Sequence, residues 1–153
     1  MARVEVKVSG GDKLAKQLAR IAHRGRGGAV RVGFLQGATY PNKGQKAGQP
    51  VAQVAFYNEF GTSRAPPRPF FRNMIHDKSP SWGRDMAKIA KAADFDTQKI
   101  LTLMGQRIKD QLVKAIVDWP ADNAPSTVAR KGFNKGLIDT GVMQRAVDFE
   151  VVR

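Results

Sequence analysis

The sequence contains no cysteine and has few of the residues on which enzymes depend. Without cysteine among the 153 residues, disulfides, thiolate metal sites and cysteine nucleophiles are excluded. The two histidines, His23 and His76, stand apart, with no spacing typical of a metal site. There is no glycine loop of the phosphate-binding or dinucleotide-binding type and no nucleophile elbow. We therefore expect no catalytic residue, no metal ligand and no cofactor.

Long apolar runs are also missing. No stretch approaches the roughly 20 apolar residues that a membrane-crossing helix needs, and the first ten residues contain no apolar signal core. We therefore expect a soluble protein that is made and used without export and that has no membrane partner.

Acidic residues are scarce relative to basic ones. Thirteen Asp and Glu face 26 Lys and Arg, which gives a formal net charge of +13. Such an excess favours a polyanionic partner. The first 50 residues hold ten basic residues against only Glu5 and Asp12, and the candidates for polyanion contact lie there: Lys13, Lys16, Arg20, Arg24 and Arg26. A solvated helix face explains Lys13, Lys16 and Arg20 equally well. No sequence-reading motif accompanies them, so only non-specific contact is indicated.

The patterning of apolar residues predicts strands and helices in alternation. Strict alternation predicts strands at 3–8 and 148–152, and residues 29–35 also have the composition of a strand. Helical spacing predicts a helix after the cap Asp12, one over 51–60, a short one over 70–76 before a break at Ser79–Pro80, more helix through most of 81–118, and a turn with a short helix within 137–146.

The longest helix is expected to begin at Asp96, whose carboxylate can cap it. Two stretches rich in Gly, Pro and polar residues, 36–50 and 120–136, are predicted to be surface loops. Together these elements predict a single α+β domain over residues 1–153. It would hold a small mixed or antiparallel sheet, several helices and one long helix in the C-terminal half.

Residues 51–72, VAQVAFYNEFGTSRAPPRPFFR, gather aromatic residues around a proline-rich link. Gly61 can take a positive φ and end the preceding helix, and the prolines stiffen the exit. Glu59 is interpreted as a carboxylate that fixes a local turn. The aromatic side chains either fill the chain's own core or are buried by a neighbouring subunit. The candidate interface residues are Phe56, Tyr57, Glu59, Phe60, Arg68, Phe70, Phe71 and Arg72.

This segment resembles the tail-completion and head–tail joining proteins of tailed bacteriophages, in which an EFGT turn is followed by a proline–arginine–proline link and paired aromatics. The matching residues are 58–62 and 67–72. Two flanking pieces agree, VRVGFLQGATYP at 30–41 and NAPSTVARKGFNKGLIDTG at 123–141, so the resemblance covers most of 29–152. Relatives often carry a proline where Gly136 stands here, which loosens that turn.

The resemblance implies a virion protein of the neck or tail region, assembled in the cytoplasm of the bacterial host. It implies a homo-oligomeric ring, expected to be hexameric, between the head connector and the tail tube or terminator. Such a ring would leave a channel for DNA, with which non-specific contact is expected. The loops 36–50 and 120–136 are candidate arms towards neighbouring subunits.

Two other functions stay open at the level of sequence. A basic protein that binds nucleic acid non-specifically would explain the charge, but it would not explain the aromatic segment. A basic hydrolytic toxin or nuclease would need titratable residues gathered in one pocket, and no local motif supplies them.

Overall fold

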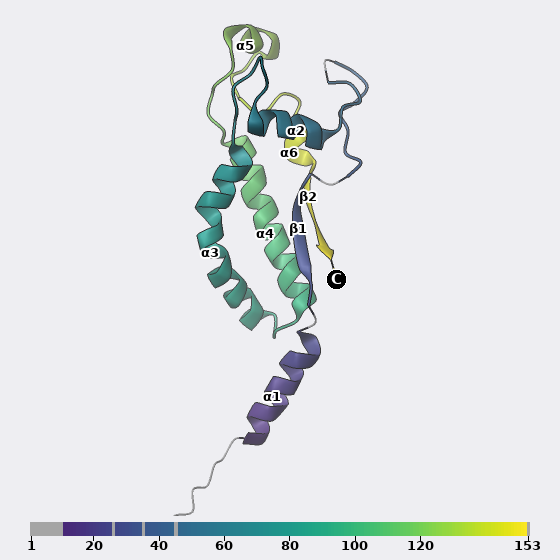
Figure 1. Cartoon of the computed structure of the whole chain (residues 1–153), viewed down its shortest axis with the longest axis vertical. Helices are drawn as coiled ribbons and strands as arrows, with labels where there is room; N and C mark the ends of the chain where they lie inside the picture. Colours follow the sequence, from purple (N-terminus) through teal and green to yellow (C-terminus); the bar gives the residue numbers. More distant parts are fainter. Residues whose placement is uncertain (1–10, 26, 35, 45, 153) are drawn as a thin grey trace, which may run out of the picture.

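The computed structural model describes residues 11–25, 27–34, 36–44 and 46–152 (Figure 1). The predicted strand at 3–8 lies outside them. The elements follow in the order α1 (Gly11–Arg24), β1 (Ala29–Phe34), α2 (Val51–Phe60), α3 (Phe70–Ala92), α4 (Thr97–Val117), α5 (Pro125–Lys131), α6 (Val142–Arg145) and β2 (Val147–Val152). Helices joined to a small antiparallel sheet confirm the predicted α+β class, and the long helix in the C-terminal half is α4.

β1 and β2 form an antiparallel pair that brings residues near the two ends of the described chain together. Val32 lies opposite Phe149, and Arg31 lies opposite Glu150. The valine and phenylalanine are partly covered, whereas Arg31 and Glu150 are exposed and form an ion pair at 3.3 Å. The sheet therefore has one apolar and one charged face, as the alternation in its strands predicts.

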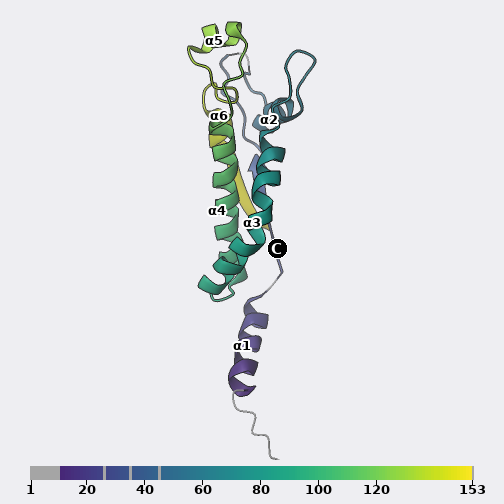
Figure 2. The same cartoon turned by 90° about the vertical axis from the view of Figure 1, so that its left-hand side faces the viewer.

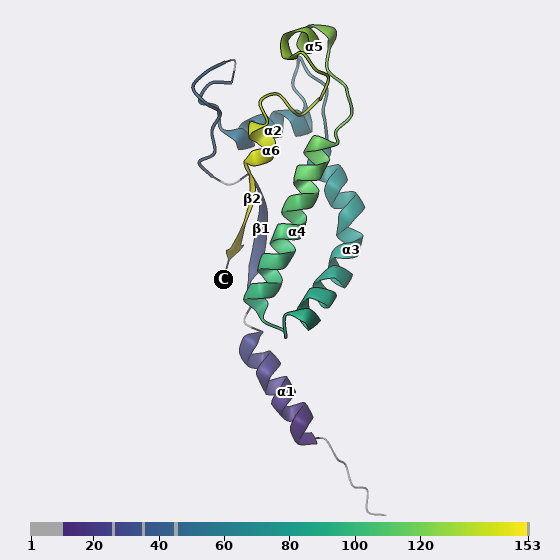
Figure 3. The same ribbon diagram turned by 180° about the vertical axis from the view of Figure 1, so that it is seen from behind.

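α4 lies between the sheet and α3 (Figures 1 and 3). The side chain of Asp96 accepts a hydrogen bond from the backbone N–H of Lys99 at 3.1 Å, so the predicted helix cap is confirmed. Gly105 sits in the middle of this helix and is buried against the sheet. A Cβ atom there would overlap the ring of Phe149 and come within 2.8 Å of Cγ2 of Val30. The lack of a side chain at Gly105 thus lets the sheet approach α4 closely.

Replacing Gly105 with alanine should destabilise the protein. The added methyl group pushes the sheet away from α4, and such overpacking costs about 1–3 kcal/mol, partly offset by the roughly 1 kcal/mol that alanine gains over glycine in a helix. Gly83→Ala in α3 is the matched control, because no atom lies within 4 Å of the Cβ it would add. Urea unfolding should show a lower midpoint for Gly105→Ala and an unchanged or higher one for Gly83→Ala. Equal midpoints would contradict the close approach.

The core lies where α2 and α6 cross the end of the α3–α4 pair (Figure 2). Its fully buried side chains come from α2, α3, α4 and β2: Val51, Phe70, Leu112, Ile116 and Val147. α2 is fixed by this core along one face only, and its opposite face is exposed.

The prediction of a break at Ser79–Pro80 is wrong, because α3 continues through Pro80 to Ala92. A proline inside a helix costs about 3 kcal/mol, but tertiary contacts hold α3 on α4 beyond it. The indole Nε1 of Trp82 donates a hydrogen bond to Oε1 of Gln111 at 2.9 Å, and Arg107 pairs with Asp85 at 2.9 Å. Local sequence reasoning could not weigh these contacts.

Both predicted loops contain hydrogen-bonded structure among their described residues. In the stretch 36–50, Tyr40 is buried and its N–H donates to the carbonyl of Gln49 at 2.9 Å. The stretch 120–136 contains α5, so the prediction of an unbroken loop there is wrong. Pro125 at the first turn and Gly132 with a φ of 80° just after the last turn are ordinary helix boundary signals.

α1 confirms a helix in this region, but it begins at Gly11, so Asp12 lies in its first turn and the prediction that Asp12 caps it is wrong. None of the residues of α1 is buried. It extends away from the other helices along the long axis of the molecule (Figure 1). Arg20 and Arg24 both pair with Asp94, and Oγ1 of Thr97 donates to the carbonyl of Arg24 at 3.0 Å.

Within the described ranges, none of the helices combines the length and apolar character needed to cross a membrane.

Candidate protein-interaction surfaces

Glu59 builds the corner between α2 and α3. It is 5% exposed, and its carboxylate accepts the backbone N–H groups of Phe71 at 2.9 Å and Arg72 at 3.2 Å. Nε of Arg72 donates to the same carboxylate at 2.8 Å. These N–H groups belong to the first turn of α3, where Pro69 supplies no side-chain cap. Glu59 therefore caps α3 from the neighbouring helix, and its negative charge lies at the positive end of the helix dipole.

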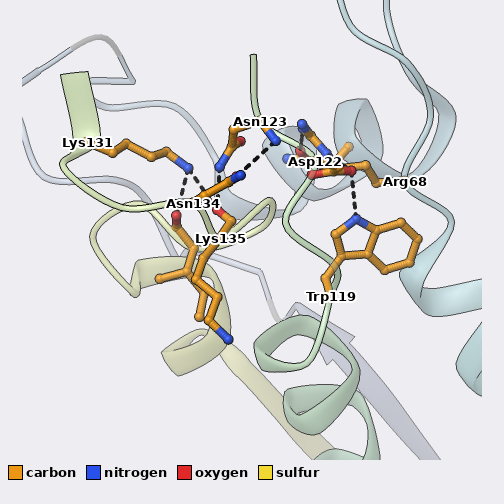
Figure 4. Close-up of polar contacts among 9 residues, drawn as sticks. Arg68, Trp119, Asp122, Asn123, Lys131, Asn134 and Lys135 are labelled. Carbon is orange, nitrogen blue, oxygen red and sulfur yellow. Dashed lines mark hydrogen bonds and ion pairs between the residues drawn. The ribbon is translucent and has the colours of Figure 1, made fainter. Parts of the chain in front are cut away.

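Arg68 ties the proline-rich link to the chain after α4 (Figure 4). Its backbone N–H donates to the carbonyl of Asn58 at 2.6 Å, and its Nε donates to Oδ2 of Asp122 at 2.8 Å. Nε1 of Trp119 donates to the same oxygen at 2.9 Å. Arg68 thus fixes the link to α2 and to the chain after α4, and its side chain is mostly buried within its own chain rather than presented to a neighbour.

The pairing of Asp122 makes stability depend on acid pH. Burial tends to raise the pKa of Asp122, but the hydrogen bonds from Arg68 and Trp119 outweigh it and hold the pKa below its usual value. A depressed carboxyl pKa contributes stability above the unfolded value of about 4, and that contribution is lost as pH falls through the folded value. The urea midpoint should therefore fall below about pH 4, and Asp122→Asn should flatten that fall. Asp118→Asn, which removes the carboxylate of an exposed ion pair with Lys114, is the comparison variant for the loss of one negative charge.

Three aromatic side chains lie exposed on the outer face of α2. Phe56, Tyr57 and Phe60 are 57%, 44% and 53% exposed. The rings of Phe56 and Phe60 are 4.6 Å apart, and the guanidinium of Arg72 lies 4.8 Å from the centre of the Phe60 ring. We call these four residues the α2 aromatic surface. Contiguous exposed aromatics on a soluble protein are typical of interaction sites.

The remaining interface candidates lie elsewhere. Phe70 is 1% exposed and fills the core, and Phe71 is partly buried against it. Phe70 and Glu59, at 1% and 5% exposed, leave almost no surface for contact with a neighbouring subunit. Their selection as interface residues is therefore corrected. The aromatic segment thus divides between the chain's own core and an exposed surface.

The polyanion candidates lie on or beside α1. Lys13 and Lys16 are exposed, whereas Arg20 and Arg24 share the carboxylate of Asp94. Arg26 lies outside the described residues. Half of the four described cations are therefore already paired with an acid, which weakens the case for a phosphate-binding face.

A hollow of about 570 Å³ lies beside α2, lined by residues that are far apart in the sequence. We call it the basic hollow. Its cations come from the 36–50 stretch, the turn after α2 and α5: Lys46, Arg64, Arg68, Arg130 and Lys131. Two carboxylates, Asp122 and Asp139, also line it.

Hydrogen bonds hold the wall of the basic hollow in shape. Nζ of Lys131 donates to the carbonyls of Ile138 at 2.7 Å and Lys135 at 3.2 Å. The side chain of Asn123 donates to the carbonyl of Lys135 at 2.9 Å. Figure 4 shows these contacts closing the segment after α4 into a loop beside the Arg68 pair.

Comparisons with protein-family models, curated proteins and solved structures found no match. The surfaces of the molecule are therefore what bears on its function. In the part of the chain that the structure describes, no three His, Asp or Glu side chains gather into a possible metal site. His76, at Nδ1, lies 3.0 Å from its neighbour Asp77 on an exposed stretch of α3.

Sequence reasoning found the α2 aromatic surface but missed the basic hollow. The cations of the hollow are spread from Lys46 to Lys131 and share no local motif. The two predicted loops, taken together, contain no larger share of basic residues than the whole chain, so no local signal indicated that their cations would meet.

Proposed function

We propose that this protein is a non-enzymatic structural subunit of a tailed-bacteriophage particle. It forms a ring in the neck or tail end that joins the head connector to the tail tube. The observation that carries the proposal is the α2 aromatic surface, an exposed cluster of rings on a rigidly held helix. The resemblance of residues 51–72, the segment that contains this surface, to head–tail joining proteins also supports it.

Rigidity makes this surface suited to assembly. α2 is held by its buried residues Val51 and Val54, and its far end is fixed through Glu59 to the start of α3. Gly61, with a φ of 78°, ends the helix, as its sequence context predicts. A surface that is already ordered loses little conformational entropy when a partner docks, so more of the contact energy remains for binding.

A ring follows if the aromatic surface of one copy meets a different face of the next. Such head-to-tail contacts close when the rotation between copies permits, and the resemblance favours six copies. α1 leaves a second apolar face exposed, through Leu14, Leu18 and Ile21. Within the particle, the ring would surround the path of the DNA, and its partners would be the connector and the tail tube or terminator.

The test is electron microscopy of lysates from a phage that carries a stop codon early in this gene. Filled heads and tails of normal length that lie unjoined would support a role at the junction. Tails of uncontrolled length would assign the protein to the tail terminator. Intact, infectious particles would overturn the structural role.

A second candidate function is non-specific binding of nucleic acid, favoured by the exposed Lys13 and Lys16 on α1. A protein whose function is to bind DNA should bind duplex DNA tightly, with a steep dependence on salt. A structural subunit should bind weakly at most near the physiological ionic strength of about 0.15 M. Titrating duplex DNA at several salt concentrations separates the two functions.

A further inference from the structure

The basic hollow carries more positive charge than its own acids neutralise. Five cationic side chains face two carboxylates, an excess of three positive charges. Arg68 is already paired with Asp122 at 2.8 Å. Among the described parts of the chain, no carboxylate pairs with the guanidinium of Arg64.

Asp139 is shared between two of the remaining cations at long ion-pair distances. Its Oδ2 lies 3.9 Å from a terminal nitrogen of Arg130 and 4.0 Å from Nζ of Lys46, too far for a direct hydrogen bond. Nζ of Lys131 is held by backbone carbonyls rather than by an acid. Arg64, Arg130 and Lys46 therefore keep hydrogen-bonding capacity for an anion.

The pKa values of two lysines in the hollow are lowered, mainly by burial. Burial lowers the pKa of Lys46, and the charges of Arg130 and Arg68 lower it further against the opposing effect of Asp139. Burial also lowers the pKa of Lys131; the charge of Asp139 opposes this effect, and the charges of Lys46, Arg130 and Arg68 add to it. An anion entering the hollow would relieve this repulsion.

The lining of the hollow points to the chemistry of its occupant. Apolar atoms of Val54, Ala65 and Pro66 lie beside the cations, so the hollow suits a group with an anionic head and an apolar stem. Planar guanidinium groups such as those of Arg64 and Arg130 match a carboxylate with two parallel hydrogen bonds. An aspartate or glutamate side chain has both features.

The hollow is continuous with the α2 aromatic surface. Tyr57 belongs to that surface and also lines the hollow. A partner that covers the aromatic rings would therefore reach the cations with the same segment. We propose that the basic hollow receives the side chain of a glutamate or aspartate of the neighbouring copy that docks on the α2 aromatic surface.

Duplex DNA fits the hollow less well. DNA is far wider than a hollow of about 570 Å³, a size typical of sites for small groups, so its phosphates would meet only the rim. The carboxylates of Asp122 and Asp139 would repel a continuous row of phosphates, whereas a single carboxylate can take the side of the hollow occupied by the arginines.

The proposal is tested on the isolated full chain by calorimetry and NMR. The probe is a blocked peptide in which glutamate alternates with glycine, and its counterpart carries glutamine. The acidic peptide should bind and shift the amide signals around Arg130 and Lys131, and the glutamine peptide should not. The double variant Arg64→Gln/Arg130→Gln should bind about tenfold more weakly, because two charge-assisted hydrogen-bonding groups are lost.

Lys88→Gln/Lys91→Gln is the matched control, since it removes the same charge from exposed sites on α3. Equal weakening in both double variants would overturn the proposal, because it would mean attraction by net charge alone. The proposal would also be overturned if inorganic phosphate bound as tightly as the peptide. The same holds if duplex DNA bound more tightly than the peptide and its binding were lost in Arg64→Gln/Arg130→Gln. The absence of peptide binding would do the same.

The identity of the partner as a neighbouring subunit rests on the proposed function, but the two can fail separately. If the peptide binds but the gene-stop phage forms intact particles, the proposed phage function is wrong and the carboxylate-binding site is still supported. If heads and tails lie unjoined but the peptide does not bind, the phage function is supported and the carboxylate-binding site is wrong.

Discussion

The double variant Phe56→Ser/Phe60→Ser should fold normally and fail to join heads to tails. Both rings are more than half exposed, at 57% and 53%, so their loss removes little packing from the chain itself. Aromatic anchors at interfaces contribute about 2 kcal/mol or more each. Losing two of them should weaken each contact between subunits about a thousandfold, if the losses add. Complementation of the gene-stop phage, scored by infectious titre and by electron microscopy, measures the effect.

Leu103→Ser is the matched control, because Leu103 is an apolar residue on α4 that is 52% exposed and remote from α2 in the fold. It should restore the titre to that of the unaltered gene. Thermal unfolding of the purified double variant should differ little from that of the parent. A normal titre for Phe56→Ser/Phe60→Ser would show that the α2 aromatic surface binds no partner in the particle.

Local patterns in the sequence predicted most of the elements because those elements are specified locally. The alternation at β2, the cap Asp96 and the terminating Gly61 each act within a few residues, and the structure confirms all three. The prediction of a break at Pro80 was wrong because long-range contacts decide the structure there. There the local cost of proline is outweighed by Trp82 and Asp85, whose partners lie on α4.

The candidate surfaces also differ in whether they are specified by one local segment or by residues that only the fold brings together. The aromatic residues of α2 stand in one continuous segment, so their concentration was visible. Which of them would be exposed was not, because Phe70 differs from Phe60 only in lying on the side of the corner that faces α4 and the core. The basic hollow depends on Lys46, Arg64 and Arg130 meeting across three segments, and only the fold brings these together.

Glu59→Ala should destabilise the protein more than any substitution on its exposed surface. It removes a buried carboxylate that accepts two backbone N–H groups and the side chain of Arg72. Those N–H groups have no intrahelical partner at the start of α3, so they are left unsatisfied in a mostly buried corner. The loss of a buried, charge-assisted network costs about 3 kcal/mol. Urea unfolding should show it as a large fall in the midpoint.

Glu150→Ala provides the comparison, since Glu150 forms an exposed ion pair with Arg31 and should contribute no more than about 1 kcal/mol. Glu59→Gln should lie between the two, because the amide oxygen can still accept one N–H while the negative charge at the helix end is lost. A loss for Glu59→Ala no larger than that for Glu150→Ala would mean that the corner is held by the core alone. The expected order of the stability losses would mean that Glu59 contributes both to folding and to the interaction surface. The carboxylate that caps α3 also holds Arg72 against the exposed ring of Phe60.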